Sequence, residues 1–129
     1  MSAFVINLEN RPGSLTRVAE ALGSAGVNIT AIAGATSGGQ GVIGLTVDDE
    51  SGARSALDGA GLSYDTVELA MVSLEDRPGG LAEAARRLSD AGVNVELLLV
   101  TGRDGPNVTV AFGVADPATA RSALGDLAG

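Results

Sequence analysis

The sequence contains no cysteine, histidine or tryptophan, and no lysine, because all eight basic residues are arginine. Without His or Cys the chain has no Ser-His or Cys-His nucleophile, no disulfide and no ordinary zinc or haem ligand set. Without Lys it has neither a Schiff-base amine nor a P-loop lysine. Carboxylates, hydroxyls, arginines and backbone groups remain, and these suit the binding of a small zwitterion better than catalysis. The sequence therefore predicts a protein that is not an enzyme, with no catalytic residues, no metal site and no cofactor.

Basic residues are also few relative to acidic ones, at 8 against 16, which gives a net charge of -8. Such a charge repels phosphate backbones and anionic membrane surfaces, so we expect neither a nucleic-acid nor a membrane partner. The first residues, MSAFVINLENRPG, lack the basic region of a secretory signal. No run approaches the roughly 18 apolar residues of a membrane span. These features predict a cytoplasmic protein.

Aromatic residues make up only 2% of the chain, although 45% of it is hydrophobic. Any core must therefore consist of Val, Leu, Ile and Ala. The chain also has 19 glycines, each of which costs about 0.5 to 1 kcal/mol inside a helix or strand. We expect marginal stability that is relieved by association.

An internal repeat organises the sequence. The segment LENRPGSL at residues 8–15 returns as LEDRPGGL at residues 74–81, an offset of 66 positions. The match extends to Ala-Gly-Val-Asn at 25–28 and 91–94. Later the offset is 67, which aligns residues 53–57 with 120–124. One residue is therefore inserted in the hairpin region between these matches.

Each half has the order β-α-β-β-α. Leu15, Val18, Ala19 and Leu22 follow helical spacing, as do their counterparts in the second half. Gly26 and Gly92 are placed to end these helices in Schellman motifs. Further strands are expected at about 27–36, 42–47, 93–100 and 108–114, and the last helix at Asp116 with Pro117 as its first residue. Residues 62–69 supply a closing strand for the first half, whereas the second half has none.

The unit of strand, Arg-Pro-Gly-x-Leu loop, helix, Ala-Gly-Val-Asn and strand resembles the ACT domain, a ferredoxin-like βαββαβ module. The resemblance implies an α+β fold of two ferredoxin-like ACT modules in tandem, at 1–68 and 69–129, with the last strand of the second missing. It further implies a free-standing regulatory protein that binds an amino acid. The alternative is an assembly or regulatory subunit that pairs with a metabolic enzyme and holds no ligand.

By resemblance, the ligand site is the loop between the first strand and first helix, together with the Asn at the start of the second strand. A helix N-terminus presents unpaired N–H groups suited to a carboxylate, which supports this placement independently. The candidate ligand-binding residues are Asn10, Arg11, Pro12, Gly13, Ser14, Leu15 and Asn28 in the first half, and Asp76, Arg77, Pro78, Gly79, Gly80, Leu81 and Asn94 in the second.

Simpler interpretations stand beside these roles. Asn10 and Asp76 suit helix caps equally well, and Arg11 and Arg77 are typical of solvated loop charges. Asn28 and Asn94 can bond local backbone. The acidic segment 48–50 favours a helix start over a cation site, and the glycine-rich segment 37–41 favours a hairpin over a phosphate cradle.

Two further expectations concern inequality and association. Asn10 and Asp76 hold equivalent positions in the repeat. Because an ionised Asp accepts hydrogen bonds but cannot donate them, the two sites should not be equivalent. The missing strand should leave residues 69–75 as an unpaired edge, which favours a homodimer or a partner protein.

Overall fold

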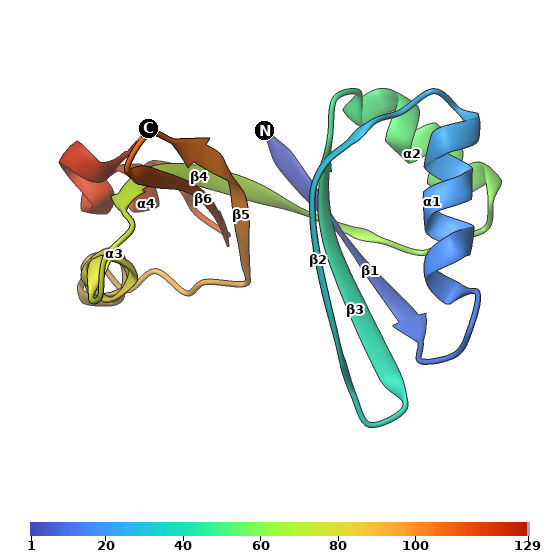
Figure 1. Cartoon of the computed structure of the whole chain (residues 1–129), viewed down its shortest axis with the longest axis horizontal. Helices are drawn as coiled ribbons and strands as arrows, with labels where there is room; N and C mark the ends of the chain where they lie inside the picture. Colours follow the sequence, from blue (N-terminus) through green and yellow to red (C-terminus); the bar gives the residue numbers. More distant parts are fainter. Residues whose placement is uncertain (129) are drawn as a thin grey trace. The chain divides into compact units, whose positions relative to one another are not determined.

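A computed structural model describes residues 1–128 of the chain, and it divides into two compact units (Figure 1). The N-terminal unit contains residues 2–66. The C-terminal unit contains Met1 and residues 67–128. Each unit has three principal antiparallel strands and two α-helices, so the predicted α+β class is confirmed.

The N-terminal unit is built from β1 (Ser2–Glu9), α1 (Ser14–Ser24), β2 (Ile29–Ser37), β3 (Gln40–Val47) and α2 (Glu50–Gly59). Its strands lie in the order β2-β3-β1, and α1 and α2 cover one face of them (Figure 1). Alternate residues of β1 and β3 point to that face, because side chains along a strand alternate. The core contains Phe4, Ile6, Val18, Leu22, Val27, Ile43, Leu45, Val47, Ala53, Leu57 and Leu62.

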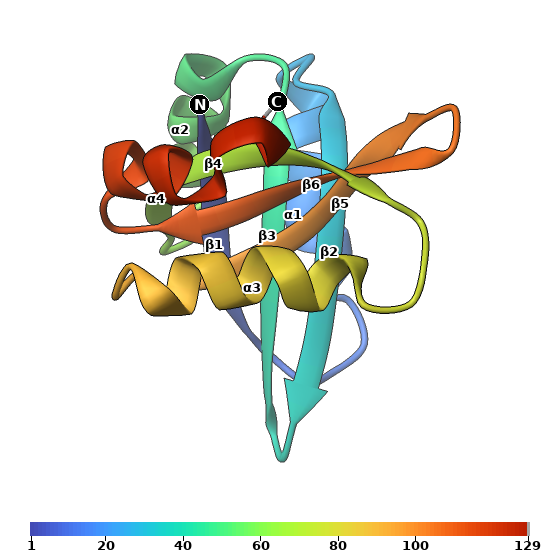
Figure 2. The same ribbon diagram turned by 90° about the vertical axis from the view of Figure 1, so that its left-hand side faces the viewer.

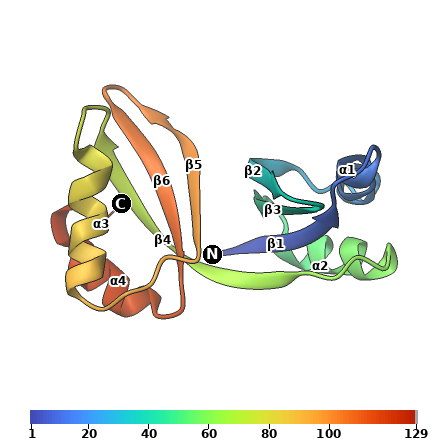
Figure 3. The same cartoon turned by 90° about the horizontal axis from the view of Figure 1, so that it is seen from below.

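The C-terminal unit repeats this plan with β4 (Asp65–Glu75), α3 (Gly80–Asp90), β5 (Leu97–Asp104), β6 (Asn107–Val114), α4 (Pro117–Leu124) and the short 3₁₀-helix η1 (Gly125–Leu127). Its strand order is β4-β6-β5, with α3 and α4 on one face (Figures 2 and 3). No helix of residues 1–128 combines the length and apolar character needed to cross a membrane.

The helix ends follow the sequence closely. Gly26 and Gly92 have φ angles of 74° and 73°, and the N–H of the next residue reaches back five positions, from Val27 to the Leu22 carbonyl at 3.0 Å. The Val93 N–H meets the Leu88 carbonyl at 2.9 Å in the same way. Both predicted Schellman motifs are therefore confirmed.

The second helix of each unit begins at an aspartate. Asp49 caps α2 by accepting a hydrogen bond from the Gly52 N–H at 2.9 Å, so the acidic segment 48–50 does start a helix. Asp116 caps α4 by accepting from the Thr119 N–H at 3.1 Å, and Pro117 is the first residue of that helix, as expected.

Two expectations about strands need correction. The strand expected from residue 93 begins only at Leu97, because the preceding segment makes a single ladder bond, from the Glu96 N–H to the Gly113 carbonyl at 2.8 Å. The edge at residues 69–75 is not wholly unpaired. After η1 the chain returns beside β4, where Ala128 forms an isolated antiparallel bridge with Val72, and the Leu69 N–H donates to the Met1 carbonyl at 3.1 Å.

A β-bulge accounts for the change of repeat offset from 66 to 67. In β5, Val100 faces Val110, whereas the next paired residue, Gly102, faces Thr109. In β2 the corresponding pairs contain no extra residue, since Gly34 faces Ile43 and Ala35 faces Val42. Thr101 is therefore the inserted residue, and beyond it Arg103 takes the place that Thr36 has in the first unit.

Candidate ligand-binding loops

The loops that join the first strand to the first helix of each unit share one backbone pattern. We call residues 10–13 the first loop and residues 76–79 the second loop. The N–H of Asn10 donates to the Gly39 carbonyl and that of Asp76 to the Pro106 carbonyl, both at 3.1 Å. In each loop the next N–H, that of the arginine, donates to the glutamate carbonyl two residues earlier at 2.9 Å.

A left-handed glycine holds the N-cap position of the helix after each loop, and no side chain caps that helix end. Gly13 has φ 91° and Gly79 has φ 85°, a region that favours glycine because a Cβ would crowd the backbone there. The interpretation of Asn10 and Asp76 as helix caps is therefore wrong, because each lies three residues before the capping glycine. The Ser14 and Gly80 N–H groups donate to the Arg11 and Arg77 carbonyls at 3.3 and 3.1 Å. Because neither capping glycine has a side chain, the next N–H groups of α1 and α3 keep the donor capacity and positive potential of a helix N-terminus.

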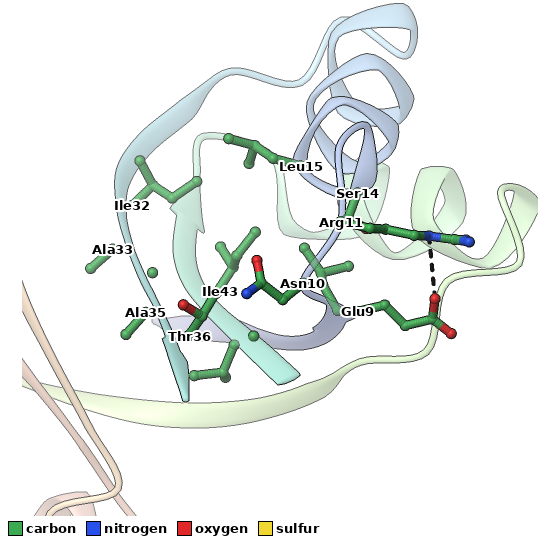
Figure 4. Close-up of a pocket in the computed structure, with 14 residues that line it drawn as sticks. Glu9, Asn10, Arg11, Ser14, Leu15, Ile32, Ala33, Ala35, Thr36 and Ile43 are labelled. Atoms are coloured by element: carbon green, nitrogen blue, oxygen red, sulfur yellow. Dashed lines mark ion pairs between the residues drawn. The ribbon is translucent and has the colours of Figure 1, made fainter. Parts of the chain in front are cut away.

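A pocket of about 570 Å³ adjoins the first loop. This volume lies within the range of small-molecule pockets in proteins. Its walls come from the end of β1, the start of α1, the middle of β2 and the start of β3 (Figure 4). The lining residues are Leu8, Glu9, Asn10, Arg11, Ser14, Leu15, Ile32, Ala33, Gly34, Ala35, Thr36, Gly41, Val42 and Ile43.

Asn10 directs its side-chain amide into this pocket (Figure 4). Its amide makes no hydrogen bond within the described part of the chain. Arg11 instead turns away and pairs with Glu9 at 3.2 Å, where both side chains are about two-thirds exposed. The amide therefore offers both a donor and an acceptor to a ligand, whereas the guanidinium is a solvated, already paired charge.

Apolar side chains line the opposite part of the pocket. Leu15 and Ile32 are 55% and 47% exposed although both face it, and Ile43 contributes a core side chain to its floor. Large apolar side chains that stay half-exposed around a hollow are typical of a binding surface. The pocket thus combines an apolar wall with an open amide and an uncapped helix end.

The structure brings together four of the seven candidates in the first half, namely Asn10, Arg11, Ser14 and Leu15. Pro12 and Gly13 shape the loop. Asn28 is not among the lining residues, and its backbone pairs with Asp48, whose carboxylate accepts from the Asn28 N–H at 2.9 Å. A direct role for Asn28, or for its counterpart Asn94, stays a prediction.

Residues of β2 and β3 were missed by the sequence reasoning. These are chiefly Ile32, Gly34 and Thr36, which form the wall across from α1. The sequence signal for this wall is the run Ala31–Ala35, in which every residue except Ile32 is small. Small side chains in a strand leave space above the sheet, where a ligand can lie.

The second loop differs from the first in its side chains. The Asp76 carboxylate is paired with the Arg103 guanidinium at 2.7 Å, from across the β5-β6 hairpin. Arg77 bonds Glu75 at 3.0 Å and Glu83 at 3.2 Å. The acceptor that corresponds to the open Asn10 amide is therefore already occupied.

Volume separates the two loops as well. By strand register, Val100 takes the place of the pocket residue Gly34, and Val108 takes that of Gly41. At the helix start, Gly80 replaces Ser14, and a Cβ at Gly80 would lie 2.7 Å from the Glu75 carbonyl oxygen. Compared with the first loop, the second loop has less space at the start of its helix, and the strands beside it carry larger side chains.

A smaller pocket of about 240 Å³ lies beside the second loop, but it contains no residue of β5 and includes Leu127 of η1. It is lined by Ser73, Leu74, Glu75, Arg77, Gly80, Glu83, Asn107 and Leu127. Of the candidates in the second half, only Arg77 and Gly80 line it. Asp76, Pro78, Gly79, Leu81 and Asn94 do not.

Other reactive groups are dispersed. Within residues 1–128 no three carboxylates gather in a way that would hold a metal ion. The ring of Tyr64 packs edge-on against Phe4 with 5.4 Å between centroids. Desolvation and the neighbouring Asp58 raise the pKa of Tyr64 above its ordinary value, so its hydroxyl stays protonated at neutral pH.

The family profile of the ACT domain matches residues 2–58 and 69–129. No curated protein matches the sequence significantly. Among solved structures, a protein from Bacteroides thetaiotaomicron is 25% identical with a TM-score of 0.80, over 95% of this chain and 85% of the other. The regulatory subunit of aspartate kinase from Thermus thermophilus, in its ligand-free form, is 21% identical with a TM-score of 0.69, over 95% and 86%. The corresponding subunit from Thermus flavus is 20% identical with a TM-score of 0.65, over 95% and 88%.

Proposed function

We propose that this chain, which belongs to the ACT domain family, is a non-catalytic regulatory protein that binds an amino acid. Its modules are residues 1–68 and 69–129, and it acts in the cytoplasm as a homodimer or together with a metabolic enzyme. Regulation then follows from a difference in ligand affinity between two arrangements of the protein. Neither nucleic acid nor membrane is a partner.

The open Asn10 amide in a pocket of about 570 Å³, beside the uncapped N-terminus of α1, carries this proposal. A carboxylate suits the free N–H groups of the helix end. An ammonium group suits the side-chain oxygen of Asn10. One zwitterion can satisfy both, with its side chain against Leu15 and Ile32.

The surroundings favour a ligand with a small neutral side chain. The only charged residues that line the pocket, Glu9 and Arg11, neutralise each other in an exposed ion pair. The remaining lining residues carry no charge: Asn10, Ser14 and Thr36 are polar, and the others are Leu, Ile, Val, Ala and Gly. A charged ligand side chain would lose hydration there without gaining a partner.

A thermal-shift panel of the common amino acids on the full chain tests the proposal. A ligand present at 100 times its Kd adds about 2.7 kcal/mol, which for a chain of this size raises Tm by about 10 °C. Asn10→Ala should abolish most of that shift. Asn7→Ala removes an exposed amide on the preceding strand, β1, outside the pocket, and is the matched control. Absence of any shift at millimolar amino acid would contradict the proposal.

The pairing of Asp76 with Arg103 favours a second candidate function, an assembly subunit that binds no ligand. For an assembly subunit we expect the polar side chains of the loops to be paired within the protein. Asp76 in the second loop is paired in this way, whereas Asn10 in the first loop is not. Light scattering separates the two: an assembly subunit forms its dimer or enzyme complex with no response to amino acids, whereas a sensor changes its association when the ligand binds.

A further inference from the structure

A cation from β5 lies against the second loop, at a position that is open beside the first loop. Asp76 occupies the repeat position of Asn10, and Arg103 occupies the position of Thr36. In the first unit both of these residues line the pocket and no side chain bridges them. In the second unit the guanidinium of Arg103 reaches the Asp76 carboxylate at 2.7 Å.

This guanidinium is well placed to compete with an amino acid. If the second loop bound a zwitterion as proposed for the first, the Asp76 carboxylate would be the acceptor for the ammonium group. Arg103 already supplies a positive charge and N–H donors to that carboxylate. A ligand must therefore displace one cation and then tolerate it nearby.

We infer that Arg103 is a built-in occupant of the second loop, which stands in for the ligand ammonium and leaves the first loop as the primary site. The inference rests on the proposed amino-acid binding and assigns its stoichiometry and its specificity-determining residue. At ligand concentrations that fill the first loop, each chain holds one amino acid, and the second loop retains its internal ion pair.

The expected size of the effect is moderate, because both side chains are more than half exposed. Loss of an exposed ion pair and a new contact between like charges are each small, and together they correspond to about a tenfold weaker affinity. The second loop should accordingly bind at least about tenfold more weakly than the first.

Site-resolved NMR titration of the full ¹⁵N-labelled chain with L-valine tests the inference. Amide shifts of residues 10–15 and 76–81 report a separate Kd for each loop. In the unmodified protein, the first loop should saturate at least tenfold earlier than the second. In Arg103→Thr, which installs the residue found at position 36, the Kd of the second loop should fall about tenfold while that of the first is unchanged.

Two controls isolate the competition between cations. Arg103→Lys keeps the positive charge and should leave the second loop as weak as in the unmodified protein. N-acetyl-L-valine lacks the ammonium group, so Arg103→Thr should not improve its binding. Equal affinities of the two loops in the unmodified chain, or no change at the second loop in Arg103→Thr, would overturn the inference.

The outcome at each loop separates this inference from the proposed function. A first loop that does not respond to L-valine or to the amino-acid panel counts against the proposed function. The inference is then still decided by the second loop, since a response that appears only in Arg103→Thr supports it and a silent second loop in that variant refutes it.

Discussion

The first and second loops have nearly the same backbone but offer different chemistry to a ligand. Each has a left-handed glycine before the helix and the same pair of anchoring backbone bonds. The first loop leaves an amide open, whereas the second pairs its carboxylate with Arg103. A repeated backbone therefore does not imply repeated chemistry, because the side chains on the facing strand decide whether the polar group of the loop is already paired.

The two cores provide the strongest test of how alike the units are. Leu22 and Leu88 are equivalent in the repeat and only 0% and 1% exposed. Truncation of a buried leucine costs about 2 to 5 kcal/mol, so Leu22→Ala and Leu88→Ala should each lower the free energy of unfolding by that amount. Urea denaturation followed by circular dichroism measures both. A large loss in one variant beside a negligible loss in the other would show that the cores are not equivalent.

Exchanging the first residues of α1 and α3 should lower the free energy of unfolding by different amounts in the two units. Gly80→Ser places a Cβ 2.7 Å from the Glu75 carbonyl oxygen, and such overpacking should cost about 1 to 3 kcal/mol. Ser14→Gly removes a small, partly buried side chain from a helix start and should cost only about 0.5 kcal/mol. Thermal unfolding of the two single variants gives the comparison. Similar losses in both would mean that the two loops are equally tight.

Gly34→Val should convert the first pocket toward the state of the second unit, where Val100 occupies this position. A Cβ at Gly34 would meet its neighbours at 3.4 and 3.5 Å, ordinary contact distances, so we expect less than about 1 kcal/mol change in stability. The added volume should weaken L-valine binding at least about tenfold. Val100→Gly is the reciprocal variant, and unchanged affinity in Gly34→Val would place the ligand elsewhere.

Acid should destabilise the second unit through the Arg87–Asp126 ion pair and the Thr119 hydroxyl bond to Asp116, which the first unit lacks. Hydrogen bonding and charge from Arg87 lower the pKa of Asp126, and hydrogen bonds from Thr119 lower that of Asp116. A carboxyl whose pKa is lower in the folded than in the unfolded protein stabilises the fold at pH values above the unfolded pKa of about 3.9. This stabilisation is lost as the pH falls from that value through the folded pKa. The first unit has Ala21 at the repeat position of Arg87.

Asp126→Asn tests this small effect. Acid unfolding followed by NMR should show a weaker pH dependence between about pH 4 and pH 2 for amides of the second unit. Amides of the first unit are the internal control. An identical acid profile in the variant and the unmodified protein would contradict a contribution from this ion pair.

Local signals in the sequence predicted much of the fold. The Schellman glycines and the Asp116-Pro117 start act within a few residues of the chain, so the sequence contains the whole motif. The loops were located because their Arg-Pro-Gly segments repeat. Asn10 is equally compatible with a helix cap, and only the structure shows that Gly13 holds the N-cap position at the beginning of α1.

Contacts between distant residues were not predictable in the same way. The wall formed by Ile32 and Thr36 depends on the register of β2 against β3. The pairing of Asp76 with Arg103 joins residues 27 positions apart and depends on the bulge at Thr101. The bridge between Val72 and Ala128 likewise required the path of the chain after α4. Each depends on tertiary register, which a single sequence does not specify.

The bulge at Thr101 also has a consequence for how duplicated genes diverge. If Thr101 were paired in the ladder and no bulge formed, Gly102 would stand opposite Val108, and Arg103 would move into the turn position that Ser37 has in the first copy. The bulge absorbs a difference of one codon between the copies without loss of the hairpin, and it thereby keeps the arginine in the register from which it reaches Asp76. A strand can thus tolerate length variation while a substitution beyond the bulge gives two descendants of one ancestral loop separate roles.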